Sequence, residues 1–127
     1  MKNLLTVTAA IEGVTGVLLV TAPSFVSKLL LASPLEGSAA LIVARLTGLA
    51  LLTLTVACWL ARLDAGTRAA NGLVTAFVLY NVGATALLAY AGIALRLSGI
   101  CLWPAVLLHA IMSAWCIMRL LKRPLPE

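Results

Sequence analysis

Charged residues are scarce in this chain of 127 residues, where Asp, Glu, Lys and Arg together make up 10%. Soluble domains carry about 25%. Hydrophobic residues account for 63% of the chain, so the composition predicts an integral membrane protein in contact with a lipid bilayer. The net charge is +5, but aromatic residues are only 6% and no basic run has aromatics interleaved with it. We therefore expect no nucleic-acid partner.

Residues that bind metals or form disulfides are also few. The three cysteines, Cys58, Cys101 and Cys116, are odd in number and have no CxxC or metal-ligand spacing, and His109 is the single histidine. The sequence has no phosphate-binding glycine loop, no nucleophile elbow and no zinc-binding helix motif. We expect no structural disulfide, no metal site and no cofactor.

Four apolar runs occupy most of the chain, at residues 4–22, 38–61, 69–93 and 99–121. Each is long enough, at 1.5 Å per helical residue, to cross a hydrocarbon layer of about 30 Å. A backbone in lipid must satisfy its own hydrogen bonds, and the runs lack the alternation of barrel strands, so all four are predicted to be helices. Glu12 interrupts the first run, which is unlike a cleaved signal peptide. The sequence thus predicts one all-α transmembrane domain over residues 1–127, a four-helix bundle.

The segment between the first two runs is too short to cross the membrane. It carries apolar residues at helical spacing, with Lys28 beside them. This pattern is typical of a short amphipathic helix lying at the membrane surface. We expect it on the outer face, and its apolar positions are Phe25, Val26, Leu29 and Leu30.

Basic residues at the ends of the runs predict the orientation of the protein. If both termini are cytoplasmic, six basic residues lie on the inner side and two, Lys28 and Arg96, on the outer side. Both termini are therefore expected in the cytoplasm, in a bacterial-type inner (plasma) membrane. The six inner residues are Lys2, Arg62, Arg68, Arg119, Lys122 and Arg123.

Each apolar run has one strongly polar residue near its middle: Glu12, Arg45, Asn81 and His109. An ionisable side chain in hydrocarbon costs about 3 kcal/mol even on lenient scales, so such residues normally turn inward and pair. Small residues near each of them suit close helix packing. We expect the four to meet in the bundle, with Glu12 and Arg45 forming a charge-assisted hydrogen bond.

The polar residues have a functional and a structural interpretation. In the first, Glu12 is an acid or base tuned by Arg45, and His109 is its counterpart. Asn81, its neighbour Tyr80 and Trp103 are then candidate ligand contacts. In the structural interpretation, Glu12, Arg45 and His109 only join helices, Asn81 is an interhelical clasp and Trp103 is an interface anchor.

The function that best fits these residues is binding or acid/base processing of a lipophilic small molecule, such as a lipid or a terpenoid-like compound. Apolar walls would supply affinity and a few polar groups orientation. If the protein is an enzyme, the chemistry is cofactor-independent isomerisation, cyclisation or epoxide opening. The alternatives are a non-catalytic subunit of a larger membrane complex, including a redox assembly, a homo-oligomer paired through these residues, and a small proton-coupled transporter.

The order of parts resembles the DoxX-like small four-helix membrane proteins. The likeness rests on a first span, the outer piece Phe25–Ala32, the second span with Arg45-Leu-Thr-Gly-Leu-Ala-Leu-Leu52, and its end at Trp59-Leu-Ala-Arg62. It covers the first two thirds of the chain and implies a four-helix membrane fold with links to quinone-coupled redox assemblies. Members more typically carry an acid in the second span, whereas here that position is Arg45 and the acid is Glu12. No site residue is therefore transferred from the family.

Overall fold

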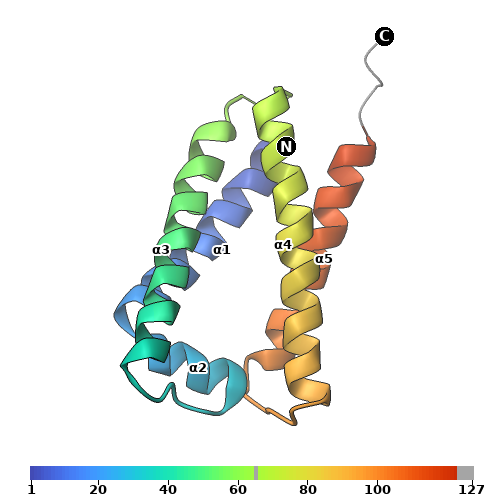
Figure 1. Cartoon of the computed structure of the whole chain (residues 1–127). Helices are drawn as coiled ribbons and strands as arrows, with labels where there is room; N and C mark the ends of the chain where they lie inside the picture. The colour runs from blue at the N-terminus through green and yellow to red at the C-terminus, as the bar shows by residue number, and fades with distance from the viewer. Residues whose placement is uncertain (65, 123–127) are drawn as a thin grey trace.

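The computed structural model describes residues 1–64 and 66–122 (Figure 1). All of the regular secondary structure in these residues is helical. Four of its helices are long and apolar enough to span a membrane. The predicted class, an all-α four-helix membrane protein with a short helix between its first two spans, is confirmed. The helices are α1 (Lys2–Thr21), α2 (Pro23–Leu31), α3 (Ser38–Ala61), α4 (Arg68–Ile93) and α5 (Leu102–Leu121).

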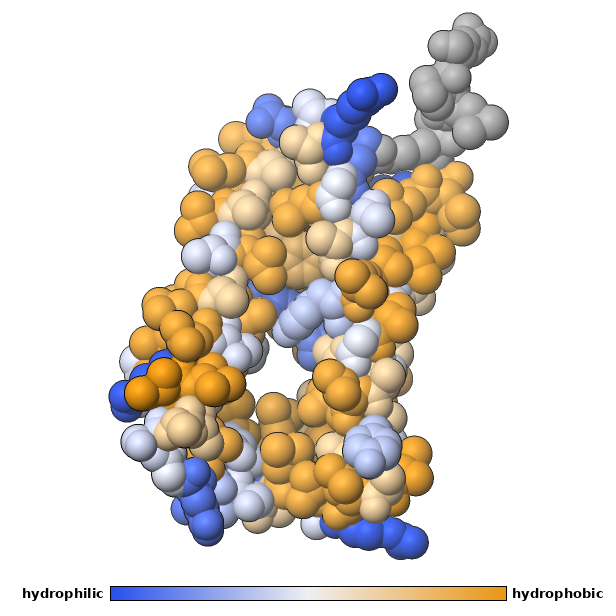
Figure 2. Space-filling model, in the orientation of Figure 1, coloured by the Kyte–Doolittle hydropathy of each residue, from blue (hydrophilic) through white to orange (hydrophobic). Residues whose placement is uncertain are grey.

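The spanning helices form two pairs. α1 packs along α3, and α4 packs along α5, whereas the two pairs approach each other much less closely. α2 lies across one end of the bundle, and the start of α1, the turn from α3 to α4 and the end of α5 share the other end (Figure 1). The outer surface of the helices is mainly hydrophobic in Figure 2, as a lipid environment requires.

The first pair is held by a contact between the backbones of two glycines. A Cβ atom built on Gly48 would lie 2.8 Å from the carbonyl oxygen of Gly16, and one on Gly16 would lie 2.9 Å from that of Gly48. No side chain larger than hydrogen fits there without parting the helices. Small residues at a helix crossing permit the close packing on which association in lipid depends.

A cluster of buried apolar side chains fills the end of the bundle that holds the start of α1. All four spanning helices contribute buried apolar side chains there, so the two pairs are joined at this end. The free thiols of Cys58 and Cys116 belong to this core. Its buried members are Leu4, Leu5, Ala9, Cys58, Val74, Phe77, Met112 and Cys116.

The opposite end is closed by α2, which is tied to the start of α5. The backbone N–H of Cys101 donates to the carbonyl of Leu29 across 2.9 Å. Gly99 packs so closely on the backbone of Leu29 and Leu30 that a Cβ atom would overlap them. The last span was expected to begin at residue 99, but α5 begins at Leu102. The difference arises because the preceding residues are used to dock α2.

Candidate functional site

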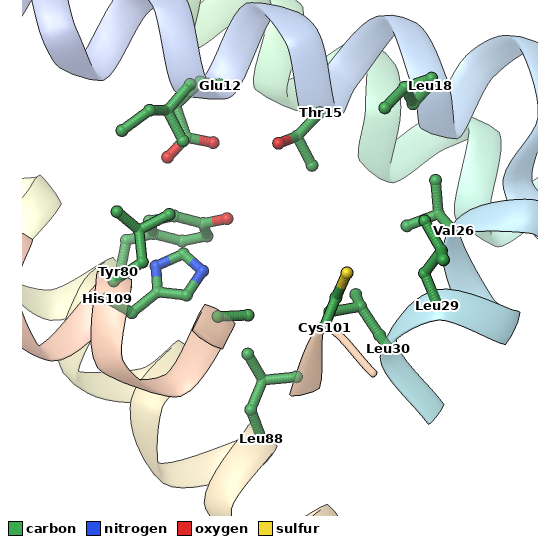
Figure 3. Close-up of a pocket in the computed structure, with 13 residues that line it drawn as sticks. Glu12, Thr15, Leu18, Val26, Leu29, Leu30, Tyr80, Leu88, Cys101 and His109 are labelled. Carbon is green, nitrogen blue, oxygen red and sulfur yellow. The ribbon is translucent and has the colours of Figure 1, made fainter. Parts of the chain in front are cut away.

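A cavity of about 260 Å³ separates the two helix pairs between the filled core and α2. α1, α2, α4 and α5 all contribute to its wall, which is mainly apolar. In Figure 3, Glu12, Tyr80 and His109 lie together at one end, and Val26 and Leu29 of α2 lie at the other. An apolar cavity with a few convergent polar groups is the usual form of a binding site for a small molecule.

The cavity opens sideways. Figure 2 shows an opening that passes through the molecule, between the two helix pairs and next to α2. α2 covers the adjacent end of the bundle, and the apolar core fills the far end. In a bilayer, the flank of a spanning helix faces acyl chains, so an opening at this position would face the lipid rather than the water on either side.

Glu12 is the acidic group of the site. It is only 4% exposed and lies on the buried stripe of α1, one turn before Gly16. Its carboxyl accepts a hydrogen bond from the hydroxyl of Tyr80 on α4, and the two groups face each other in Figure 3. This bond links the two helix pairs at the polar end of the cavity.

His109, on α5, is oriented by Asn81 on α4. The distance between His109 Nδ1 and Asn81 Oδ1 is 2.8 Å, and Asn81 Nδ2 donates to the carbonyl of Phe77 across 2.8 Å. Because a carbonyl only accepts, this second bond determines which way the amide points, and Asn81 Oδ1 must then accept a hydrogen bond donated by the Nδ1–H of His109. In the neutral imidazole, Nε2 is therefore left as an acceptor. Within residues 1–64 and 66–122, no protein group donates a hydrogen bond to this Nε2 atom.

Aromatic packing holds the two rings of the site in place. The rings of Tyr80 and His109 meet edge to face, with centroids 5.6 Å apart and an angle of 82° between their planes. Phe77 packs on Tyr80 in the same way, at 6.2 Å and 89°. Such contacts stabilise and restrict both rings. A carboxyl, a phenol and an imidazole are thus presented together at one end of an apolar cavity.

The predicted inward position of Arg45 is wrong. Arg45 is exposed on α3, and in the described part of the chain no ion pair or hydrogen bond reaches it, so Glu12 pairs with Tyr80 instead. The buried stripe of α3 runs through Gly48, Leu51 and Cys58, and Arg45 lies to one side of it. Near the start of the helix, its long side chain can extend toward the membrane surface.

Trp103 and Asn81 do not line the cavity either. Trp103 is 52% exposed and packs beside Gly92 on α4, which agrees with an anchor at the membrane surface rather than a ligand contact. Asn81 is 2% exposed and lies behind His109, where it is a clasp between α4 and α5. Two lining residues, Thr15 and Cys101, were not predicted as site residues. Thr15 follows Glu12 by three residues and so shares its face of α1, but the position of Cys101 depends on how the loop docks on α2.

Comparisons with protein-family models, with curated proteins and with solved structures found no match. The resemblance to the DoxX-like proteins therefore stays a prediction. In the residues that the structure describes, no group of three or more His, Cys, Asp or Glu side chains could hold a metal ion. Function must be argued from the cavity and the groups that line it.

Replacing Asn81 by leucine is expected to lower the free energy of unfolding by about 2 kcal/mol. The change leaves His109 Nδ1 without its partner and removes the side-chain hydrogen bond to the carbonyl of Phe77, which keeps its helical backbone bond. Chemical denaturation in detergent micelles measures the loss, and ¹⁵N NMR of His109 should show a changed tautomer balance. Asn71→Leu is the matched control, since the Oδ1 of Asn71 has no hydrogen-bond partner among the described residues. Equal stability of the two variants with an unchanged His109 spectrum would contradict the clasp.

Proposed function

We propose that the protein binds a lipophilic small molecule that reaches the cavity sideways from the bilayer. The observation that carries this proposal is the opening in the flank between the helix pairs (Figure 2). It leads into an apolar space of about 260 Å³ that ends at Glu12, Tyr80 and His109. A lipophilic molecule is already concentrated in the bilayer, so its polar part can reach these groups while its chain remains in contact with apolar walls and lipid.

The same groups suit acid/base chemistry on a lipid or terpenoid-like substrate. Glu12 supplies a carboxyl that exchanges a proton with the ligand, and Nε2 of His109 is a free acceptor nearby in the same cavity. Tyr80 holds the carboxyl, and Asn81 holds the imidazole in the required tautomer. A positioned acid and base of this kind are sufficient for isomerisation, cyclisation or epoxide opening.

The proposed location is a bacterial-type inner membrane with both termini in the cytoplasm. Lys2, Arg68 and Lys122 belong to the end of the bundle that also holds the turn from α3 to α4, and Lys28 belongs to the opposite end. Arg123, the last residue of the predicted inner set, lies outside the described residues. A membrane-impermeant amine reagent applied to intact cells should label Lys28 and leave Lys2 and Lys122 unlabelled, and the reverse pattern would overturn the orientation.

Native mass spectrometry of the protein, extracted gently from its own membrane, tests the binding function. We expect a retained small molecule in the unaltered protein. The matched control is Ala105→Phe, because Ala105 lines the cavity and a phenyl ring there would fill it. Loss of the molecule in this variant places it in the cavity. A molecule retained equally by both proteins, or by neither, would contradict the proposal.

Arg45 favours a second candidate, a subunit of a larger membrane complex or a homo-oligomer. It is exposed within an apolar span, beside outward-facing Ile42 and Leu46 that are 57% and 59% exposed. A cation in that setting is stabilised either by reaching the membrane surface or by an anionic group of another chain, and this candidate takes the second route. A constant partner chain in the mass spectrum, without a small molecule, would support this candidate over the first. Proton-coupled transport ranks below both, because the apolar core separates Glu12 from the far end of the bundle.

A further inference from the structure

The ionisable side chains that line the cavity are mainly acidic. Glu12 and His109 line it, together with the weakly acidic side chains of Tyr80 and Cys101, and no lysine or arginine is among the described residues that line it. Lys28 on α2 and Arg45 on α3 are both exposed, and neither lines the cavity. An anionic group brought into this apolar space would leave water without gaining a counter-charge.

The groups of the site that are free to bind a ligand are mainly hydrogen-bond acceptors. The hydroxyl proton of Tyr80 is directed to Glu12, and the Nδ1 proton of His109 is directed to Asn81. What remains for a ligand is the Nε2 lone pair and the remaining lone pairs of the Glu12 carboxylate, which are acceptors, and the thiol of Cys101, which is only a weak donor. The Thr15 hydroxyl, which also lines the cavity, adapts to either role.

Protonation of Glu12 would not reverse this preference. It converts one acceptor into a donor but adds no positive charge, so an anionic ligand would gain a hydrogen bond but would still lack a counter-charge. A ligand ammonium group, by contrast, donates a charge-assisted hydrogen bond to the carboxylate. An alcohol donates to the same oxygens or to His109 Nε2 and carries no charge to desolvate.

We infer that the cavity selects amphiphiles whose polar group donates hydrogen bonds and carries no negative charge, namely long-chain amines and alcohols, over carboxylates and phosphates. This inference rests on the proposed function and specifies the class of its ligand. The polar group would lie between Glu12 and His109. The chain would run along the apolar end of the cavity, past Leu88 and Leu30, and out through the flank into the lipid.

Three probes of equal chain length test the inference: decylamine, 1-decanol and sodium decanoate. Their affinities are measured on the full chain in a non-ionic micelle by thermal shift and native mass spectrometry. The buffer is held at about pH 8, where an ordinary imidazole is neutral. We expect decanoate to bind at least about tenfold more weakly than the tighter of the other two probes. Decanoate binding as tightly as that probe would overturn the inference.

Variants that fill the cavity distinguish a wrong ligand class from failure of the proposed binding function. Ala105→Phe should abolish binding of all three probes, and Leu88→Trp, at another lining position, replaces it if the first variant does not fold. If the filled variants lose binding while decanoate equals decylamine in the unaltered protein, the cavity binds ligands but the inferred class is wrong. If no probe binds the unaltered protein, or filling the cavity changes nothing, the proposed binding function itself is contradicted.

Discussion

Glu12→Gln is expected to weaken decylamine binding at least tenfold while leaving the helical fold intact. The glutamine amide is nearly equal in size to the carboxyl and can still accept the hydrogen bond from Tyr80, but it carries no charge. A hydrogen bond to a charged group contributes about 1.5–3 kcal/mol, which corresponds to roughly a ten- to hundredfold change in affinity. Binding of 1-decanol should change much less, because an alcohol does not depend on the negative charge. Thermal shift with both probes, and circular dichroism for helix content, measure the effect.

The matched control for this charge change is Glu36→Gln. Glu36 is exposed in the segment between α2 and α3, away from the cavity, so its neutralisation should leave both affinities unchanged. If Glu12→Gln does not fold, the carboxyl is mainly a structural link between the helix pairs. If it folds and binds decylamine normally, Glu12 is not part of the ligand site.

Gly48→Ala is expected to destabilise the protein by about 3 kcal/mol, a large effect for one added methyl group. The new Cβ atom would lie 2.8 Å from the carbonyl oxygen of Gly16, and 2.9 Å from side-chain atoms of Leu19 and Val20. The backbone carbonyl cannot rotate away as a flexible side chain can, so α1 and α3 must move apart. Thermal or chemical denaturation in micelles should show an early transition, with loss of folded protein during purification.

Gly83→Ala makes the same chemical change at a position where we expect the opposite effect on stability. Gly83 lies within α4, and nothing lies within 4 Å of a Cβ atom built on it. Alanine is favoured over glycine in a helix by about 1 kcal/mol, so this variant should be neutral or more stable. Equal behaviour of Gly48→Ala and Gly83→Ala would mean that the close crossing of α1 and α3 is not a determinant of stability.

The number of spans, their helical structure and the short helix after the first span were all determined by the sequence alone. The reason is physical: an apolar run must satisfy its backbone hydrogen bonds internally, and its length decides whether it crosses the bilayer. The predicted helix boundaries agree with the structure where an apolar run is flanked by a turn, as at Ser38 and Ala61. The start of α5 at Leu102 was not predictable, because it depends on the docking of residues 99–101 onto α2.

The partners of the polar residues were decided by the tertiary structure. Sequence spacing gives the depth of Glu12 and Arg45 along their helices, but the rotation of each helix depends on what it packs against. The crossing at Gly16 and Gly48 determines which stripe of α3 faces α1, and Arg45 lies outside that stripe. Tyr80 rather than Arg45 therefore meets Glu12. The cavity, too, exists only because two tight helix pairs are joined at their ends and held apart between them, a distance that no local pattern in the chain encodes.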